Sequence, residues 1–341
     1  MKAAIIGNGF ISSAHREAFA MFKEEGVDIE LVAICDIRPE MLKKNNGERL
    51  YTSVDDMLEA EKDLDFVCLC IPTYLHAEYS IKLMKAGLNV LCEKPMALTL
   101  EDCDRMIKCS KETGKRLMIA QCSRFGKDMI IMKNFIEEGS FGKPVSVFFT
   151  AADGKPTWGF ENWFADEKRS GGAMLDLQAH TIDLINWFFG VPDSTSTIAK
   201  QCNPDFTGYG SISSNLMYDN GLFVHVWCDW GIPQNKHDQR YTRINFEKGY
   251  VIRKVGANAE LSAVSYADGT VTNLSDRYRA VKSGHRDEIE YFARQLASGE
   301  PLDYCPPEET KNVVAVMRAQ EKSADAMGAP VRIEKQSEVS L

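Results

Sequence analysis

The chain has 341 residues, of which 44% are hydrophobic and 26% charged, an ordinary composition for a globular protein with a sizeable core. Its formal net charge is -9 and no basic block is present, which excludes a nucleic-acid backbone as the natural partner. No apolar run is long enough to span a membrane, and the first one breaks at Gly7, unlike a secretion signal. We therefore expect a cytoplasmic protein of about two domains.

The ten cysteines show neither Cys-x-x-Cys pairs nor a tight cluster with histidines. Cys68 and Cys70 alternate with apolar residues in a probable strand, which favours small buried thiols over metal ligands. We expect no metal site.

The first fifteen residues combine three elements. Lys2 to Ile6 form an apolar, strand-like run, Gly7-Asn8-Gly9 follows at once, and apolar residues then recur at helical spacing. A strand, a glycine turn and a helix open a dinucleotide-binding unit, because Gly9 leaves room for a pyrophosphate at the helix start. Ser12 stands where such a motif has its third glycine. An ordinary tight turn is the alternative.

A second strand, Glu30 to Ile34, ends next to Asp36, where an acid would accept hydrogen bonds from the adenosine ribose. Asp36 would repel a 2'-phosphate, so the sequence favours NAD over NADP. Arg38 either contacts such a phosphate or is a solvated loop residue.

Strands and helices continue to alternate up to Gln121, which predicts a doubly wound parallel sheet in a first domain, residues 1–122. The expected elements are strands Asp65 to Ile71, Leu88 to Cys92 and Leu117 to Gln121, and helices Leu75 to Ala86 and Thr99 to Lys111. Ligands bind beyond the carboxyl ends of such strands. Pro72-Thr73 with His76, and Glu93-Lys94-Pro95, fall there; His76 either lines the nicotinamide side or only starts a helix.

Residues 123–341 change in character and predict an α+β domain with a large, mostly antiparallel sheet. A helical connection, Ser123 to Glu138, comes first. The expected strands are Val145 to Ala151, Ser211 to Tyr218, Leu222 to Trp230, Tyr241 to Glu247, Tyr250 to Lys254 and Glu260 to Ala267. Helices Arg286 to Ala297 and Pro307 to Met327 close the chain.

Gly172 to Gly190 reads as one helix that is apolar nearly all round. Asp176, His180 and Asp183 would then form a single stripe, since they are spaced i, i+4 and i+7. The stripe is either an internal ion-pair row or the wall of a water-poor cleft, where an imidazole beside a carboxylate is suited to move a proton.

Together these motifs resemble the glucose-fructose oxidoreductase, inositol dehydrogenase and MocA (Gfo/Idh/MocA) family of NAD(P)-dependent sugar and cyclitol oxidoreductases. The resemblance covers nearly the full length and is carried by Gly7-x-Gly9 with His15, Asp36, Pro72-Thr73, Glu93-Lys94-Pro95, Arg124-Phe125, Gly171-Gly172 and Asp176 with His180. It implies a catalytic group of Lys94, Asp176 and His180, and a homo-oligomer formed through the open sheet. Gln178 departs from the pattern, which commonly has a small residue there.

We therefore expect an NAD-dependent enzyme that moves a hydride between nicotinamide C4 and a secondary alcohol or ketone of a sugar, sugar derivative or cyclitol. The expected cofactor-binding residues are Gly7, Asn8, Gly9, Phe10, Ile11, Asp36, Ile37, Arg38, Ile71, Pro72, Thr73, His76, Glu93, Lys94 and Gln121. The expected substrate-binding residues are Lys94, Arg124, Trp163, Asp176, His180 and His237. A glycosidase acting by transient oxidation and a non-catalytic NAD-responsive binding protein are the alternatives.

Overall fold

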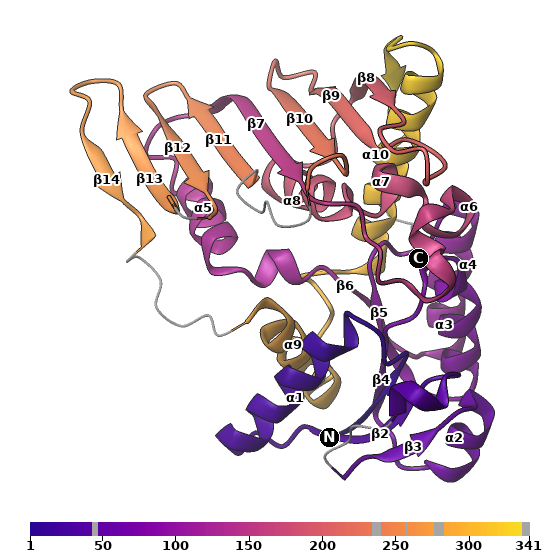
Figure 1. The fold of residues 1–341 in the computed structure, drawn as a ribbon. Coiled ribbons are helices and arrows are strands. Elements are labelled where there is room, and N and C mark those ends of the chain that lie inside the picture. The colour runs from indigo at the N-terminus through magenta and orange to yellow at the C-terminus, as the bar shows by residue number, and fades with distance from the viewer. Residues whose placement is uncertain (43–46, 234–239, 257, 276–282, 336–341) are drawn as a thin grey trace. The chain divides into compact units, whose positions relative to one another are not determined.

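The computed structural model describes residues 1–42, 47–233, 240–256, 258–275 and 283–335 (Figure 1). The chain divides into two compact units. Unit 1 comprises Met1–Phe125, Trp158–Trp163 and Lys282–Lys311, and unit 2 comprises Gly126–Thr157, Phe164–Val281 and Asn312–Leu341. Two segments from later in the sequence thus belong to unit 1.

A parallel sheet forms the centre of unit 1, with described strands in the order β3-β2-β1-β4-β5-β6. Their bounds are β1 Lys2–Ile6, β2 Glu30–Cys35, β3 Arg49–Tyr51, β4 Phe66–Leu69, β5 Asn89–Glu93 and β6 Leu117–Ala120. Every residue of β4 and β6 is buried, as expected for strands covered on both faces. The predicted doubly wound parallel sheet is confirmed, and the short edge strand β3 is an addition to it.

The helices of unit 1 are α1 Ser12–Glu25, α2 Val54–Ala60, α3 His76–Lys85, α4 Leu100–Thr113 and α9 Gly284–Ser298, with short 3-10 turns η1 Pro39–Leu42, η2 Thr73–Leu75 and η3 Cys122–Phe125. Helices α3, α4 and α9 lie within two residues of their predicted bounds, whereas α2 was not predicted. Thr99 caps α4, since its hydroxyl oxygen accepts a hydrogen bond from the backbone N–H of Asp102 at 3.1 Å.

Helix α9 completes the core of unit 1, although it lies almost 260 residues after α1 in the chain. The two helices pack side by side, and Arg286 of α9 bonds the carboxylate of Glu25 at 2.6 Å. Phe292 also meets Phe66 of β4 edge to face, with ring centroids 5.6 Å apart. One face of the parallel sheet is therefore covered by elements from both ends of the sequence.

Unit 2 is built on a mixed sheet whose described strands run in the order β14-β13-β12-β11-β7-β10-β9-β8-β15. Their bounds are β7 Pro144–Ala152, β8 Ser194–Lys200, β9 Ser211–Met217, β10 Phe223–Asp229, β11 Arg240–Phe246, β12 Gly249–Lys254, β13 Glu260–Ser265, β14 Val271–Asn273 and β15 Val331–Arg332. Only β7 and β10 pair in parallel, and the other pairs among these strands are antiparallel. The predicted mostly antiparallel sheet is confirmed, but β8, β14 and β15 were not predicted.

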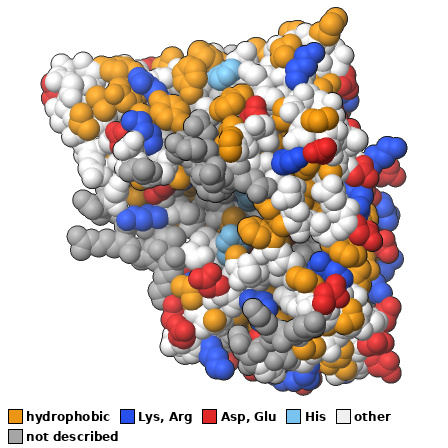
Figure 2. All heavy atoms as spheres, in the orientation of Figure 1, with side chains coloured by type: hydrophobic (Ala, Val, Ile, Leu, Met, Phe, Trp, Pro, Cys, Tyr) orange, Lys and Arg blue, Asp and Glu red, His pale blue; other side chains and the backbone are white. Residues whose placement is uncertain are grey.

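Helices cover one face of this sheet. The remaining helical segments are α5 Lys127–Glu138, η4 Phe160–Ala165, α6 Glu167–Ser170, α7 Gly172–Leu175, α8 Ala179–Phe189 and α10 Pro307–Asp325. Phe135 of α5 contacts Phe246 of β11, and Phe188 of α8 contacts Phe149 of β7. Hydrophobic side chains also gather on the surface over these strands (Figure 2), where Phe148 and Phe223 are 39% and 43% exposed.

All ten cysteines are free thiols, and eight of them are buried, which confirms the expectation of small buried thiols at those positions. Cys202 is exposed and Cys122 is intermediate. Within the described ranges, no helix combines the length and apolar character needed to cross a membrane.

The prediction of one continuous helix from Gly172 to Gly190 is wrong. The segment forms α7 and α8, joined by a turn at Asp176, Leu177 and Gln178 in which the N–H of Gln178 donates to the carbonyl of Ala173, five residues back. The carbonyl of Met174 accepts instead from the side-chain amide of Gln178, at 3.2 Å. A buried side chain thus replaces the regular backbone donor and stabilises the break.

We expect Gln178→Ala to lower the free energy of unfolding by about 1–3 kcal/mol, because it leaves the buried carbonyl of Met174 without this donor. Gln320, whose amide donates to Gln178 at 3.2 Å, also loses a partner. Chemical denaturation of both forms measures the change. Gln201→Ala is the matched control, since the exposed Gln201 also bonds a backbone carbonyl, and an equal loss in the two variants would contradict the account.

Candidate active site

The glycine turn after β1 has the geometry that a dinucleotide requires. Gly7 has a φ of 91°, and a Cβ there would lie 2.2 Å from the carbonyl oxygen of Cys70, so only glycine fits. A Cβ on Gly9 would meet only the Arg38 guanidinium, at 3.9 Å, which leaves the turn open beside the start of α1. Backbone N–H groups of a helix start bind phosphate, so the turn fits the pyrophosphate of NAD.

Ser12 takes the place of the third glycine without disturbing the turn. Its side chain is 1% exposed, and its hydroxyl donates to the carbonyl of Gly9 at 2.7 Å. It also lies 3.2 Å from the side-chain oxygen of Asn8. The hydroxyl therefore stabilises the turn from inside.

Asp36 follows β2 and is almost fully buried. Its carboxylate accepts a hydrogen bond from the backbone N–H of Asn8 at 2.7 Å and three from Arg38, each at 2.9 Å. Burial opposes ionisation, but these hydrogen bonds outweigh it and lower the pKa of Asp36. An ionised acid is thus placed to accept hydroxyl hydrogens of a ribose, in competition with Arg38.

An aromatic segment of unit 1 lies against the same residues, which the sequence analysis did not foresee. The ring of Phe160 lies 4.7 Å from the Arg38 guanidinium, and the ring of Trp158 lies 4.9 Å from that of Phe10. The aromatic residues clustered from 158 to 164 were the feature of the sequence from which this contact could have been expected.

We expect Asp36→Ala to raise kcat/KM with NADP by at least about tenfold, or about 1.4 kcal/mol. The variant removes the charge that repels a 2'-phosphate and releases the Arg38 guanidinium to bind it. Steady-state kinetics with NAD and NADP measure the change. The double variant Asp36→Ala, Arg38→Ala is the control: if it keeps the gain with NADP, Arg38 is not the phosphate ligand.

The Glu93-Lys94-Pro95 segment lies at the end of β5, and buried groups hold it in place. Glu93 is 6% exposed; one carboxylate oxygen lies 2.7 Å from Nε2 of His15, and the other accepts the backbone N–H of Lys94 at 3.2 Å. Although burial opposes ionisation, the hydrogen bond with His15 and the nearby His285 and Lys94 lower the pKa of Glu93 to about 2. Lys94 itself is partly exposed, beside a buried negative charge.

His76 connects this segment to the end of β4. It is 1% exposed, and its two ring nitrogens lie 2.8 Å from the carbonyl oxygen of Pro95 and 2.9 Å from that of Ile71. Burial lowers the pKa of His76. A neutral imidazole has one N–H, so His76 donates a hydrogen bond to one of these two carbonyls and lies against the other.

The other expected cofactor residues differ in exposure. Phe10 and Ile37 are each 66% exposed, while Ile11, Ile71 and Pro72 are partly exposed. Thr73 and Gln121 are buried, at 2% and 0% exposed.

The expected substrate residues are also unequally placed. Arg124 is 1% exposed. It donates hydrogen bonds to the carbonyl of Tyr304 at 2.6 Å and to the carboxylate of Glu309 at 2.8 Å. These bonds fix the chain segment that follows α9. Trp163 is partly exposed and belongs to unit 1. His237 lies outside the described residues.

Asp176 and His180 stand out in unit 2 by their exposure. Among residues 171–185 they alone are partly exposed, and the other thirteen are buried. Asp183, the third member of the expected stripe, is 0% exposed. One carboxylate and one imidazole beside the break between α7 and α8 are thus partly exposed in an otherwise buried segment.

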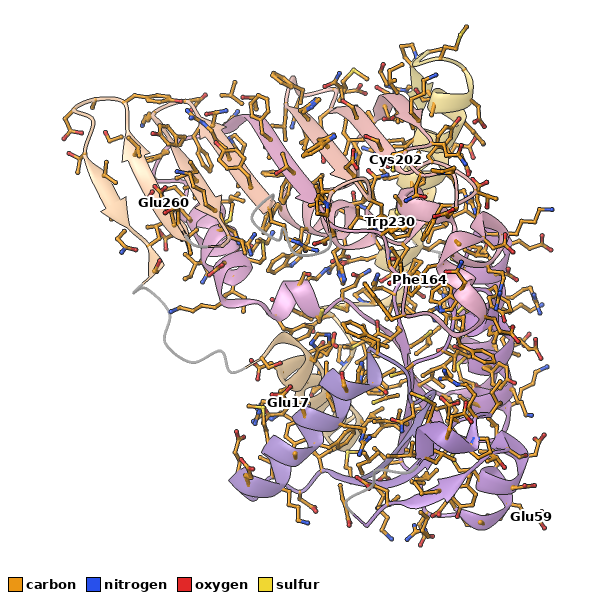
Figure 3. The ribbon with its side chains drawn as sticks, in the orientation of Figure 1. Glu17, Glu59, Phe164, Cys202, Trp230 and Glu260 are labelled. Atoms are coloured by element: carbon orange, nitrogen blue, oxygen red, sulfur yellow. The ribbon has the colours of Figure 1, made fainter. Side chains whose placement is uncertain are left out.

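A cavity of about 480 Å³ lies in unit 2 and was not foreseen from the sequence. Lys155, Asn203 and Trp230 contribute to its lining, and Figure 3 shows Trp230 beside Cys202 and Phe164. The Lys155 ammonium bonds the Asp205 carboxylate at 2.7 Å. The loop that contains Tyr209 contacts the start of α7, where the Tyr209 carbonyl accepts a hydrogen bond from the N–H of Ala173 at 3.2 Å.

The glycine turn, the acid after β2 and the parallel sheet define a dinucleotide-binding oxidoreductase. Residues 1–121 match the model of an oxidoreductase family with an NAD-binding Rossmann fold, and residues 129–252 match the GFO/IDH/MocA C-terminal domain. The chain belongs to the Gfo/Idh/MocA family. It is an NAD-dependent dehydrogenase of the kind that acts on CH–OH groups.

Three curated relatives illustrate the similarity. The myo-inositol 2-dehydrogenase of Thermotoga maritima is 33% identical over 195 residues, which are 56% of this chain and 55% of that protein. The D-glucoside 3-dehydrogenase of Escherichia coli is 25% identical over 95% of both chains. The inositol 2-dehydrogenase of Salmonella typhimurium is 28% identical over 88% of this chain and 87% of its own.

Solved structures agree with the fold. The WlbA dehydrogenase of Bordetella pertussis, in complex with NADH and UDP-GlcNAcA, superposes with a TM-score of 0.84 at 25% identity over 98% of both chains. A levoglucosan dehydrogenase in complex with NADH gives 0.85 at 20% identity, over 98% of this chain and 99% of that one.

Proposed function

We propose that this protein oxidises a secondary alcohol of a sugar, sugar derivative or cyclitol with NAD, or reduces the matching ketone, and that Lys94, Asp176 and His180 are its catalytic residues. The selective exposure of Asp176 and His180 in a buried segment carries the proposal. Polar side chains in apolar surroundings are costly and are retained where chemistry needs them. The names of the relatives, inositol 2-dehydrogenase and D-glucoside 3-dehydrogenase, support this substrate class.

Each residue has a distinct role in the proposed reaction. His180 takes the proton of the substrate hydroxyl during oxidation, since an imidazole titrates near neutral pH. Lys94 stabilises negative charge on the substrate oxygen, and Asp176 orients the hydroxyl or the imidazole. NAD, when bound, accepts the hydride. In the reverse direction the same groups return the proton and polarise the ketone.

Unit 1 supplies the residues that would hold the cofactor. The Gly7–Gly9 turn would take the pyrophosphate and Asp36 the adenosine ribose. The fixed carboxylate of Glu93 would keep the Lys94 backbone in place by its hydrogen bond to the Lys94 N–H. A positioned lysine loses less entropy on stabilising the oxygen than a flexible one.

We expect His180→Ala to lower kcat by about 10²- to 10⁴-fold, because the variant lacks the proton acceptor. The dissociation constant for NAD should stay within about twofold of the wild-type value, since its expected ligands lie in unit 1. Stopped-flow turnover and fluorescence titration with NAD measure the two quantities. Parallel loss of turnover and NAD binding would contradict the assignment.

Lys94→Ala should lower kcat by a similar factor, because the variant lacks the cation that stabilises charge on the substrate oxygen. Lys108→Ala is its matched control, because Lys108 is an exposed lysine on α4 of the same unit. Full activity of Lys94→Ala would remove Lys94 from the catalytic group.

A substrate panel tests the reaction class itself. We expect NADH absorbance to rise with one or more free sugars, inositols or sugar acids, and to fall with the matching ketone. Release of an aglycone from glycosides without a net change in NADH would point instead to hydrolysis by transient oxidation.

We also propose that the chain forms a homo-oligomer through the helix-free face of its mixed sheet. Phe148 and Phe223 lie on neighbouring strands there, together with Ile198, which is 51% exposed. Exposed apolar side chains of this kind favour contact with another protein surface.

A further inference from the structure

Two imidazoles and two carboxylates meet in the interior of unit 1, beneath the proposed catalytic lysine. His15 lies on α1, Glu93 ends β5, and His285 and Glu288 lie on α9, beside α1 in Figure 1. The nearest polar atoms of Glu93, His285 and Glu288 all lie within 4.8 Å of one another. The rings of His15 and His285 have centroids 5.8 Å apart.

The two carboxylates, Glu93 and Glu288, differ in their hydrogen-bond partners. Glu93 has His15 and the Lys94 N–H as partners. Glu288 is 0% exposed, and neither of its carboxylate oxygens has a hydrogen-bond partner among the described residues. A buried charge without partners is unstable, and two carboxylates this close do not both ionise at low cost. The cluster therefore holds one negative charge and one neutral acid.

The surrounding groups decide which acid is neutral. Burial and the Glu93 charge raise the pKa of Glu288 well above its usual value, whereas the pKa of Glu93 is lowered. Burial also lowers the pKa of His285, so this imidazole supplies no cation at neutral pH.

Thiols are the other titratable groups near Glu288. Cys68, Cys70 and Cys122 have pKa values raised chiefly by burial and also by the nearby carboxylates. They are neutral and offer Glu288 no positive charge.

We propose that Glu288 is a neutral acid that positions the Glu93 carboxylate, and with it the backbone of Lys94, for the reaction proposed above. The proton of Glu288 reaches Glu93 or His285 directly after a small side-chain rotation or through one bridging water. This role rests on the proposed function of Lys94. The neutral state of Glu288 does not, and it is tested separately.

Thermal unfolding of Glu288→Gln tests the protonation state without any activity assay. Glutamine keeps the shape and neutrality of the acid. In the wild type, Glu288 ionises in the unfolded chain above a pKa of about 4.5 but stays neutral when folded, so stability falls as pH rises above that value. We expect the melting temperature of Glu288→Gln, relative to wild type, to rise between pH 5 and pH 8. A difference that stays constant or falls over that range would mean that Glu288 is ionised in the folded protein, and would overturn the proposal.

Kinetics test the positioning role. Glu288→Gln should keep kcat within about twofold, whereas Glu288→Leu should lower kcat by about tenfold or more with the NAD dissociation constant unchanged. Equal, wild-type kcat values in both variants would overturn the positioning role. If Glu288→Leu does not fold, a large loss of kcat in folded Glu288→Gln overturns the neutral-acid role. Full activity of Lys94→Ala would show that the catalytic assignment has failed, rather than the role of Glu288.

Imidazole and carboxylate are common zinc ligands, so a bound divalent cation is the competing account of the same side chains. Elemental analysis of the purified protein, before and after Zn²⁺ is added and removed by dialysis, measures this. We expect no retained metal. Stoichiometric metal that is lost in Glu288→Gln would overturn the neutral-acid proposal.

Discussion

The hydrogen bond between His15 and Glu93 is the interaction on which unit 1 depends most. It joins the helix that follows the glycine turn to the end of β5, 78 residues later in the chain. Both side chains are almost fully buried, so the bond is protected from water. Its loss would leave the Glu93 carboxylate in apolar surroundings without this partner. The same carboxylate holds the backbone of Lys94. The segment proposed to bind the cofactor and the segment that carries the proposed catalytic lysine are thereby coupled through one group.

Local sequence patterns predicted the parallel sheet well because each of its strands is a short apolar run bounded by a turn. β1 and β2 were placed within a residue of their observed ends. β8, Ser194–Lys200, was missed because its serines and threonines resemble a loop, although Thr195 and Thr197 are buried and hydrogen-bonded to each other at 2.9 Å. The return of α9 to unit 1 depends on packing between distant segments, and no local pattern reports it.

The candidate site was predicted less completely, for a similar reason. The sequence identifies which residue types are present, but whether a side chain faces solvent depends on tertiary packing. Arg124 has the chemistry of an anion ligand, yet its guanidinium serves Tyr304 and Glu309 inside unit 1. Phe160 carried no motif, yet it lies against Arg38. Asp36 and Arg38 were singled out from the sequence as cofactor residues, but their mutual hydrogen bonds become visible only in three dimensions.

The break between α7 and α8 changes how the polar residues of this segment are related to one another. In one continuous helix, Asp176 and His180 would share a stripe with Asp183, and all three would need the same environment. The turn at Asp176 to Gln178 separates Asp176 from α8, whereas His180 and Asp183 share that helix; Asp183 is fully buried, while Asp176 and His180 are partly exposed. Gln178 is also the residue at which this chain departs from the pattern it resembles. The residue that departs from the pattern therefore stabilises, through its side-chain amide, the turn that carries Asp176 of the proposed catalytic group.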